Sequence, residues 1–294
     1  MNPRPGGIRT GTLAIITPGM LTTVQDLGRP GHGHLGVPPS GAADSAALRL
    51  ANRLVGNLEH AAGLECTMGG LSFVVDVDRY ISVTGAPVTV SVDDCPITEP
   101  GRFFVNAGSR ITLGQPLYGL RTYVAVAGGI DAPRTFGSAS TDTLSGLGGT
   151  AVPAEAELPL AVPAGPVPDV PLELALTVVP ARAERIRFRW GPRVEGISDH
   201  ARNAFTRSQW QVSSATNRVG ARLIGPRLFP DACDQPSEGM VTGTIQIPES
   251  GQPIIFLADH PTTGGYPVIG VVAEDDLGLV AQSRPGTQLL FTAI

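Results

Sequence analysis

The stretch LSFVVDVDRYISVTGAPVTVSV, residues 71–92, indicates the class of the fold. It is rich in β-branched and aromatic residues, and Asp, Gly and Pro interrupt it where a chain would turn. Similar short runs lie at 103–113, 122–127, 253–257 and 288–291. Strands do not alternate regularly with helices, so the sequence predicts a mainly β protein built as a barrel or sandwich.

One segment is instead typical of an amphipathic helix. Apolar residues recur at helical spacing from Ala47 to Leu58, Asp44 is suited to cap the N-terminus of that helix, and Gly56-Asn57 is suited to end it. Shorter helices are expected to begin at Asp199 and near Asp275.

Composition divides the chain into two parts. Residues 148–171 are mostly Ala, Pro and Val, which predicts a linker between an N-terminal β domain, 1–147, and a C-terminal β domain, 172–294. Near the start of the second domain, the run RIRFRW at 185–190 places three arginines on one face of a strand. That face either binds anions or is a surface that faces solvent or another protein chain.

The chain has 294 residues, and all 21 of its Lys and Arg residues are Arg. The absence of lysine excludes a lysine Schiff base, a complete Walker A loop, and biotin or lipoate carried on this chain. The formal net charge of −5 indicates neither a nucleic-acid partner nor binding to an anionic membrane. Chemistry that needs an ε-amine therefore belongs to another chain.

Three widely spaced cysteines, Cys66, Cys95 and Cys233, indicate reduced and mostly buried thiols rather than disulfides or a metal cluster. The apolar run at 13–16 is too short for a signal sequence or a membrane span. We therefore expect a cytoplasmic protein without a membrane segment.

The first candidate binding region lies at 22–44, where Gly and Pro alternate with polar residues. Such a backbone is irregular and can point several donors and acceptors into one pocket. The candidate residues are Gln25, Asp26, Arg29 and Ser40. An ion pair between Asp26 and Arg29 that only fixes the loop is the structural alternative.

The second candidate region is spread over 213–267 and offers hydroxyls, amides and guanidinium groups suited to an anionic ligand. Its turn Thr263-Gly264-Gly265-Tyr266 could direct backbone N–H groups at an oxyanion, or could simply close a hairpin between 253–257 and 268–272. The candidate residues are Asn217, Arg218, Arg222, Glu238, Gln246, Thr263 and Tyr266.

Weaker signals lie elsewhere. His32 and His34 have no third ligand near them in the sequence, so no metal site is predicted. Asp259 and His260 could form an acid–base pair, although a His beside a surface turn is the commoner case. The Gly/Ser/Thr-rich stretch 128–149 could lie over a phosphate, but it lacks the Walker lysine.

Several longer strings together resemble one family. They are TTVQDLGRPG, GVPPSGAAD, ANRLVGN, YVAVAGGI, NRVGARL, SEGMVTGTIQIP and PTTGGYPVIG, in this order. With them the chain resembles the biotin-dependent carboxyltransferase, or allophanate hydrolase subunit 2, family, and within it the type that serves as the C subunit of 5-oxoprolinase. The likeness runs over almost the whole chain.

The resemblance implies a fold of two cyclophilin-like, antiparallel β-barrel units with a few short helices. It implies an obligate partner, the B subunit of the allophanate hydrolase subunit 1 type, and a transient partner, the A subunit. Together the three proteins open 5-oxo-L-proline to glutamate at the expense of ATP, with or without Mg, bound by the complex. The chain itself carries no covalent biotin.

The resemblance also guides the roles of the candidate residues. Arg218 and Arg222 are expected to clamp an anion, and Asp26 and Glu238 to act as catalytic carboxylates. The substrate- and anion-binding set is Gln25, Arg29, Ser40, Asn217, Arg218, Arg222, Gln246, Thr263 and Tyr266.

Two other functions remain open. One is the carboxyltransferase component of a urea carboxylase or allophanate-type system that uses biotin carried on another chain. The other is a non-enzymatic antagonist of a kinase inhibitor, because some members of the family have such a role.

Overall fold

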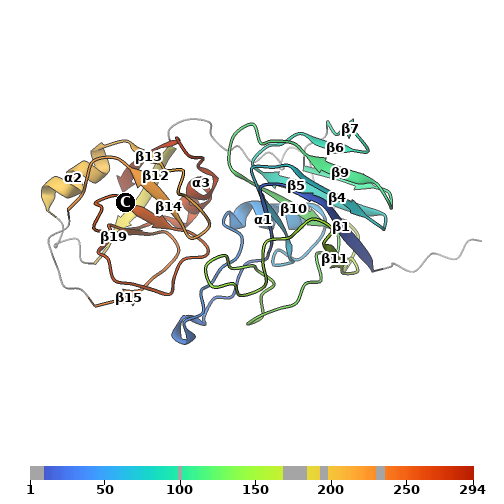
Figure 1. Cartoon of the computed structure of the whole chain (residues 1–294), viewed down its shortest axis with the longest axis horizontal. Coiled ribbons are helices and arrows are strands. Elements are labelled where there is room, and N and C mark those ends of the chain that lie inside the picture. Colours follow the sequence, from blue (N-terminus) through green and yellow to red (C-terminus); the bar gives the residue numbers. More distant parts are fainter. Residues whose placement is uncertain (1–9, 99–100, 168–183, 193–197, 230–235) are drawn as a thin grey trace, which may run out of the picture.

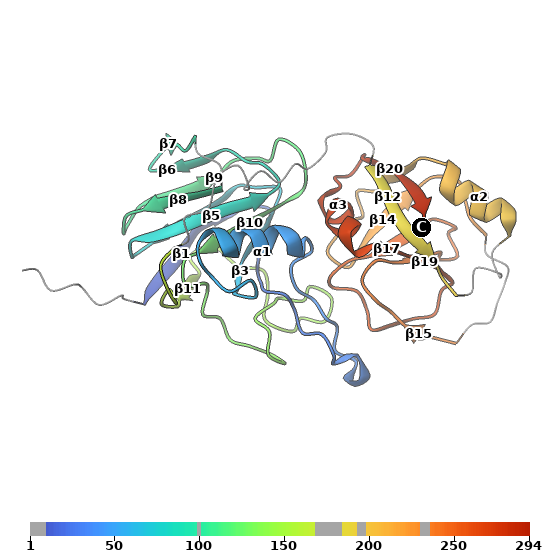
Figure 2. The same ribbon diagram turned by 180° about the vertical axis from the view of Figure 1, so that it is seen from behind.

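The computed structural model describes residues 10–98, 101–167, 184–192, 198–229 and 236–294. The mainly β prediction is confirmed, and the strands form two halves that lie side by side (Figures 1 and 2). Cys233 and the segment 172–178 lie outside the described residues. No helix within the described ranges is long and apolar enough to cross a membrane.

The N-terminal half consists of two sheets packed face to face. The first sheet has the order β11-β1-β4-β9-β6-β7 and the second β2-β3-β10-β5-β8. The strands of the first sheet are β1 (Gly11–Pro18), β4 (Leu71–Val75), β6 (Val90–Val92), β7 (Cys95–Pro96), β9 (Arg110–Leu113) and β11 (Glu157–Leu160). Those of the second are β2 (Leu21–Gln25), β3 (Gly63–Thr67), β5 (Arg79–Gly85), β8 (Gly101–Val105) and β10 (Arg121–Val126).

The central strand β10 is buried on both faces. Its Val124 packs with Leu13 and Phe73 in the core between the two sheets. Its Tyr123 and Ala125 point the other way and pack against α1 (Ser45–Leu54), which covers the outer face of the second sheet. Alternate side chains of a strand point to opposite faces, so the two covers explain why β10 is buried along its whole length.

The helix predicted after Asp44 is confirmed. The Asp44 side chain accepts a hydrogen bond from the Ala47 N–H, which satisfies a free donor of the first turn. The helix ends at Leu54, just before the Gly56-Asn57 stop that the sequence indicates, and Gly56 there adopts a left-handed φ of 75°.

The C-terminal half is a closed barrel in the order β12-β19-β16-β17-β14-β13-β20. Its strands are β12 (Glu184–Trp190), β13 (Trp210–Val212), β14 (Gly220–Ile224), β16 (Thr244–Gln246), β17 (Ile254–Phe256), β19 (Val268–Val272) and β20 (Gln288–Ala293), and β15 (Glu238–Gly239) pairs with β18 (Thr263–Gly264) outside it. The β12–β20 pair is parallel, and the other strand pairs of the barrel are antiparallel. Phe188, Phe205, Trp210 and Phe291 fill its interior.

Two further helices belong to this half. The predicted start at Asp199 is confirmed by α2 (Asp199–Arg207), which packs on β20. The helix expected near Asp275 is a 3-10 turn, η4 (Glu274–Asp276), followed by α3 (Leu277–Gln282). A second 3-10 turn, η1 (Gly33–Leu35), lies in the loop before α1. Helix α3 contacts α1, so it lies where the two halves meet (Figure 1).

The sequence left a barrel or a sandwich open, and in the N-terminal half the structure shows the sandwich. Its described strands form two sheets and not the closed barrel that the family resemblance implies. The chain changes sheet between β1 and β2 at Gly19, whose φ is 70° and where a Cβ would lie 2.3 Å from the Gly69 carbonyl oxygen. Residues 157–160 of the predicted linker form β11, which extends the first sheet by pairing with β1.

The arginine-bearing strand has the predicted alternation. Arg185, Arg187 and Arg189 point outward from β12. Arg187 binds the Asp276 carboxylate through Nε and Nη2, so this arginine is used within the chain.

Candidate functional site at the junction of the two halves

Loops at the edge of the N-terminal half meet turns of the barrel, and most of the predicted site residues lie there. The loop after β2 folds back tightly, because the Arg29 N–H donates to the Pro39 carbonyl at 2.7 Å and the Ala42 N–H to the Asp26 carbonyl at 2.9 Å. Gly28 permits this approach, since a Cβ there would lie 2.5 Å from the Pro39 oxygen.

Asp26 is a buried anchor for this loop. Its Oδ1 accepts from the Gly28 N–H at 2.8 Å and from the hydroxyls of Ser138 and Ser140 at 2.6 Å each. Its Oδ2 accepts from the Ala139 N–H at 2.8 Å. Both oxygens are therefore occupied, and the structure argues against the acid–base role predicted for Asp26.

Gln25 and Arg29 are buried beside Asp26 and only partly paired. Arg29 donates to the carbonyls of Thr135 and Ser140, and Gln25 donates to the Thr141 carbonyl at 2.9 Å. The Arg29 Nη1 and the Gln25 Oε1 have no hydrogen-bond partner among the described residues.

The predicted clamp Arg218 binds carboxylates of its own chain. It is 1% exposed, and its Nε and Nη2 each lie 2.9 Å from an oxygen of Asp259. Its Nη1 donates to Glu65, and Nη2 also donates to the Gly41 carbonyl at 2.6 Å. The predicted role as a clamp for an external anion is therefore wrong for this structure, because burial and internal carboxylates occupy the guanidinium.

Glu65 is held from several sides. Its Oε2 accepts from the Tyr123 hydroxyl at 2.8 Å and the Ala43 N–H at 2.9 Å, and its Oε1 lies 3.4 Å from the Arg121 Nε. Burial alone would raise the pKa of Glu65, but the charges of Arg218 and Arg121 outweigh it and lower that pKa. We call Glu65, Arg121, Arg218 and Asp259 the interlock, and each is at most 2% exposed.

Asp259 receives donors from both halves. Besides Arg218, the Ser40 hydroxyl donates to it at 2.9 Å, and the Thr143 N–H and hydroxyl donate at 2.9 and 2.7 Å. Burial would raise the pKa of Asp259, but Arg218 and Thr143 more than offset this effect and lower it. Asp259 is thus an ionised internal ligand, and Ser40, which the sequence assigned to ligand binding, orients it.

His260 follows Asp259 and is 2% exposed. Its Nδ1 lies 2.7 Å from the Pro261 carbonyl, which can only accept, so Nδ1 carries the proton and Nε2 is free to accept. Burial lowers the pKa of His260, and the Pro261 carbonyl and the charges of Asp142 and Asp259 offset this only in part. The ring is therefore a neutral acceptor.

Besides Arg121 Nε, which has the Glu65 carboxylate at 3.4 Å, four buried polar atoms of the junction lack a hydrogen-bond partner among the described residues. We call them the orphan set: Gln25 Oε1, Arg29 Nη1, Asp142 Oδ2 and His260 Nε2. Asp142 is charge-coupled to Arg29 and, separately, to His260. Buried polar atoms are nearly always paired with protein, water or ligand. One donor and three acceptors suit a neutral group that carries both C=O and N–H.

A cavity of about 430 Å³ opens beside the end of the Asp259–His260 turn, at Pro261. Leu144 and Pro261, the chain neighbours of Thr143 and His260, form part of its wall. Five predicted site residues line it: Asn217, Arg222, Gln246, Thr263 and Tyr266. The structure brings these five side chains to one cavity, and both ligand binding there and the role of each residue remain predictions.

These lining side chains differ in how far their polar groups are already paired within the chain. Gln246 is buried and donates to the Tyr266 carbonyl at 3.0 Å, and Asn217 accepts from the Val219 N–H at 2.9 Å. Arg222 is exposed on β14 and forms no ion pair with any described residue. Among the lining side chains, Arg222 is therefore the one suited to an anionic group.

Glu238, the second predicted carboxylate, does not line this cavity. It lies on β15, opposite Gly264 of β18. The Thr263–Gly264 segment pairs with β15, and β17 and β19 both pair with β16. The alternative of a simple hairpin between β17 and β19 is therefore wrong.

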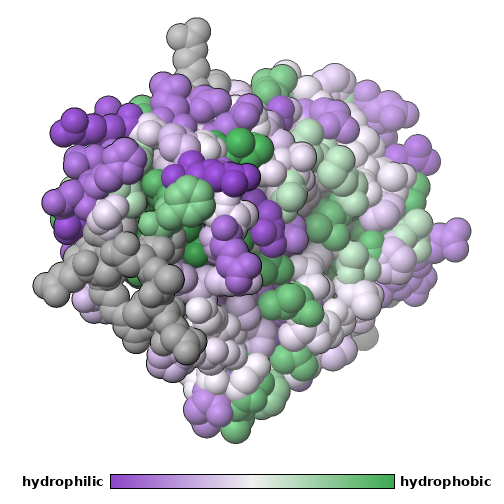
Figure 3. Space-filling view, turned by 60° about the vertical axis from the view of Figure 1, so that its left-hand side comes forward, coloured by the Kyte–Doolittle hydropathy of each residue, from purple (hydrophilic) through white to green (hydrophobic). Residues whose placement is uncertain are grey.

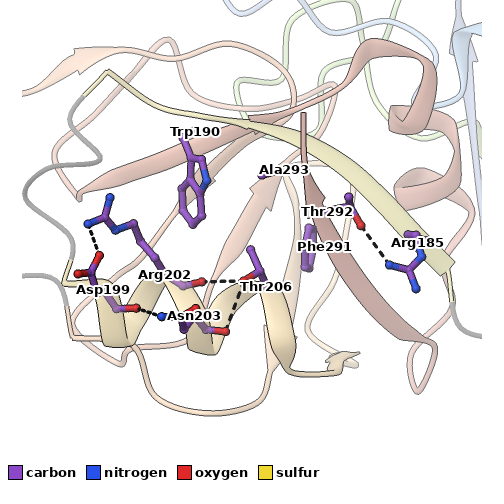
Figure 4. Close-up of a pocket in the computed structure, with 9 residues that line it drawn as sticks. All are labelled: Arg185, Trp190, Asp199, Arg202, Asn203, Thr206, Phe291, Thr292 and Ala293. Atoms are coloured by element: carbon purple, nitrogen blue, oxygen red, sulfur yellow. Dashed lines mark hydrogen bonds and ion pairs between the residues drawn. The ribbon is translucent and has the colours of Figure 1, made fainter.

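A second cavity, of about 560 Å³, lies at the α2 end of the barrel, away from the N-terminal half (Figures 1 and 4). Arg202 pairs with Asp199 at 2.5 Å, and Arg185 donates to Thr292 at 3.2 Å. Figure 3 brings this end forward and shows apolar residues scattered among hydrophilic ones. None of the predicted site residues lines this cavity, so the junction is the better candidate site.

Within the described ranges, no three His, Cys, Asp or Glu side chains are grouped so that they could hold a metal ion.

Two residues of the site, Glu65 and Asp142, were not predicted from the sequence. The Asp-His pair at 259–260 was the available signal for the site, and nothing local distinguishes Glu65 from other strand residues.

Comparison with known proteins gives a consistent result. The family model described as carboxyltransferase domain, subdomain A and B, matches residues 35–293. The chain is 39% identical over 284 residues to the 5-oxoprolinase C subunit of Escherichia coli (strain K12), covering 95% of this chain and 90% of that protein. It is 34% identical over 278 residues to the Haemophilus influenzae protein of the same name, covering 92% and 88%.

A solved structure shares the fold. The urea carboxylase of Kluyveromyces lactis superimposes with a TM-score of 0.86 at 30% identity, covering 96% of this chain. The match covers only 27% of that longer protein. Both kinds of relative align with nearly the whole of this chain, so the junction between the halves lies within the shared region.

Proposed function

The chain belongs to the carboxyltransferase domain family, subdomain A and B, and from this premise we propose that it is the C subunit of a 5-oxoprolinase. One observation carries the proposal. Over nearly all of its residues the chain is 39% and 34% identical to two proteins named as 5-oxoprolinase C subunits, against 30% for the urea carboxylase. This higher similarity supports the 5-oxoprolinase interpretation.

The proposed reaction is the ATP-dependent hydrolysis of 5-oxo-L-proline to glutamate. Its substrate is a lactam, whose carbonyl carbon is a poor electrophile because the ring nitrogen donates electrons to it. Transfer of a phosphoryl group from ATP to the lactam oxygen would activate that carbon toward hydrolysis, provided cationic or N–H donors stabilise the charge.

The orphan set suits such a substrate. Arg29 Nη1 is a donor for the lactam carbonyl oxygen, and Asp142 Oδ2 and His260 Nε2 are acceptors for the ring N–H or an attacking water. Arg222, in the adjoining cavity, is a candidate partner for the substrate carboxylate.

The proposal includes partner proteins. We infer that the chain acts in the cytoplasm with the B subunit, of the allophanate hydrolase subunit 1 type, as an obligate partner and the A subunit as a transient one. The assembled complex binds ATP, with or without Mg. No magnesium ligands are assigned within the described part of this chain. Since the sequence has no lysine, any biotin in the system is attached elsewhere.

A second candidate is carboxyl transfer to urea. The similarity to the urea carboxylase structure favours it, and the orphan set fits urea, which is also a C=O flanked by N–H groups. In this case a biotinylated partner chain would deliver the carboxyl group.

The test is reconstitution of this chain with its partner proteins, followed by measurement of ATP hydrolysis that depends on 5-oxoproline. A parallel arm supplies urea and a biotinylated carrier. We expect turnover with 5-oxoproline, and loss of it in Asp142→Asn but not in Asp131→Asn, an exposed control. Turnover only in the urea arm would replace the first proposal by the second, and no turnover in either arm would favour a binding role.

A further inference from the structure

The Asp259–His260 turn of the barrel is fixed by groups of both halves. Ser40, Thr143 and, through Arg218, Glu65 all converge on Asp259. Arg218 is the central group, because its guanidinium binds Asp259 with two parallel hydrogen bonds and Glu65 with a third. Two-point binding fixes orientation as well as distance.

Holding the two halves together does not by itself require buried ion pairs. Taking ions out of water is costly, and well-packed apolar residues of similar volume often stabilise a buried contact equally well or better. The interlock contains two carboxylates and two guanidiniums, all buried. What an ionic network adds to an apolar contact is fixed geometry at the atoms it joins, and the residue after Asp259 is His260.

A second contact between the halves provides a comparison. Arg284 donates to the carbonyls of Gly119 and Pro116, and Gln282 binds the backbone of Arg121. These residues join the halves at α3 and β10, and they make no hydrogen bond to Asp259 or His260. A general effect of holding the halves together should therefore appear equally at Arg284.

We propose that Arg218 and Glu65 are positioning residues for His260: they hold the Asp259–His260 turn in the geometry that keeps Nδ1 on the Pro261 carbonyl and leaves Nε2 unpaired for a ligand. The proposal rests on the proposed function only for the reaction that His260 serves. The charged groups that act on the ring are Asp142 and Asp259, and Arg218 compensates the second of these.

The experiment compares Arg218→Lys with Arg284→Lys, each of which keeps the charge and removes the planar guanidinium. Nitrogen NMR of the histidine-labelled full chain reports the tautomer and titration of His260, assigned by its absence in His260→Gln. We expect Arg218→Lys to mix the two tautomers and to move the titration of His260 upward in pH. Arg284→Lys should leave both unchanged.

In the reconstituted complex we expect Arg218→Lys to lower kcat about 100-fold with KM unchanged, since small displacements of reacting groups have effects of that size. If Arg218→Lys does not fold, Glu65→Gln replaces it, with the same expected direction. An unchanged His260 spectrum in Arg218→Lys or in Glu65→Gln overturns the proposal. So does a fall in kcat in Arg284→Lys equal to that in Arg218→Lys. Because the NMR arm needs no substrate, it gives its answer even if the complex does not hydrolyse 5-oxoproline.

Discussion

Arg218 and Arg222 lie four residues apart in one motif, yet they belong to two different regions of the site. Arg218 is buried in the interlock, where carboxylates from both halves occupy its guanidinium. Arg222 projects from β14 into the cavity and is exposed. The comparison shows that burial and internal counter-charges decide whether an arginine organises the protein or remains available to a ligand.

The largest expected effect concerns stability. Arg218→Ala leaves the buried Asp259 without its cation and Glu65 with Arg121 alone, which should lower the free energy of unfolding by about 3–5 kcal/mol. Arg222→Ala removes an exposed side chain and should change it by less than about 0.5 kcal/mol. Chemical denaturation of both variants measures the difference, and equal losses would contradict the division into two regions.

The next effect concerns His260, which lies between the two regions. His260→Gln removes the neutral ring acceptor and should lower kcat of the reconstituted complex by about 100-fold or more, as expected for loss of a general base. The melting temperature should stay near that of the wild type. The exposed His34 provides the matched control, His34→Gln, which should keep full turnover.

Arg222 should affect binding more than turnover. Arg222→Gln removes a candidate partner of the substrate carboxylate, so KM for 5-oxoproline should rise about 10-fold, the equivalent of one exposed charge-assisted hydrogen bond, with kcat retained. A fall in kcat at constant KM would place Arg222 in the chemistry and not in substrate binding.

The smallest effect is the pH dependence of stability. The folded-state pKa of His260 lies below its ordinary value of 6.5, so the unfolded chain takes up the proton first and stability falls as the pH falls below that value. Glu65 and Asp259 have lowered pKa values, and their contribution is lost at more acidic pH as they protonate. Denaturation at a series of pH values should show the loss of stability below pH 6.5 in the wild type and in Arg222→Gln. His260→Asn should not show it.

The sequence predicted the strands, the three helices and the five lining residues of the cavity, because these depend on local patterns. It could not predict whether the N-terminal sheets close into a barrel, since closure depends on hydrogen bonds between edge strands far apart in the chain. It also assigned Arg218 to a ligand, because its partner Glu65 lies 153 residues away and nothing near either residue indicates the pair.

The orphan set could not be predicted for the same reason, because it depends on residues that are far apart in the chain. Asp142 lies in a stretch whose composition indicated only a weak phosphate loop, and its unpaired Oδ2 becomes visible once the loop folds against Arg29 and His260. Gln25 and Arg29 were predicted site residues, and the structure places them in this set, whereas Asp26 between them serves as an anchor.

The most direct measurement is the separate determination of kcat and KM for Arg218→Lys and Arg222→Lys in the reconstituted complex with 5-oxoproline. If Arg218 positions the site and Arg222 faces the ligand, Arg218→Lys lowers kcat and leaves KM unchanged, whereas Arg222→Lys raises KM and leaves kcat unchanged. The opposite pattern, with KM raised by Arg218→Lys and kcat lowered by Arg222→Lys, would contradict the roles assigned to the two regions.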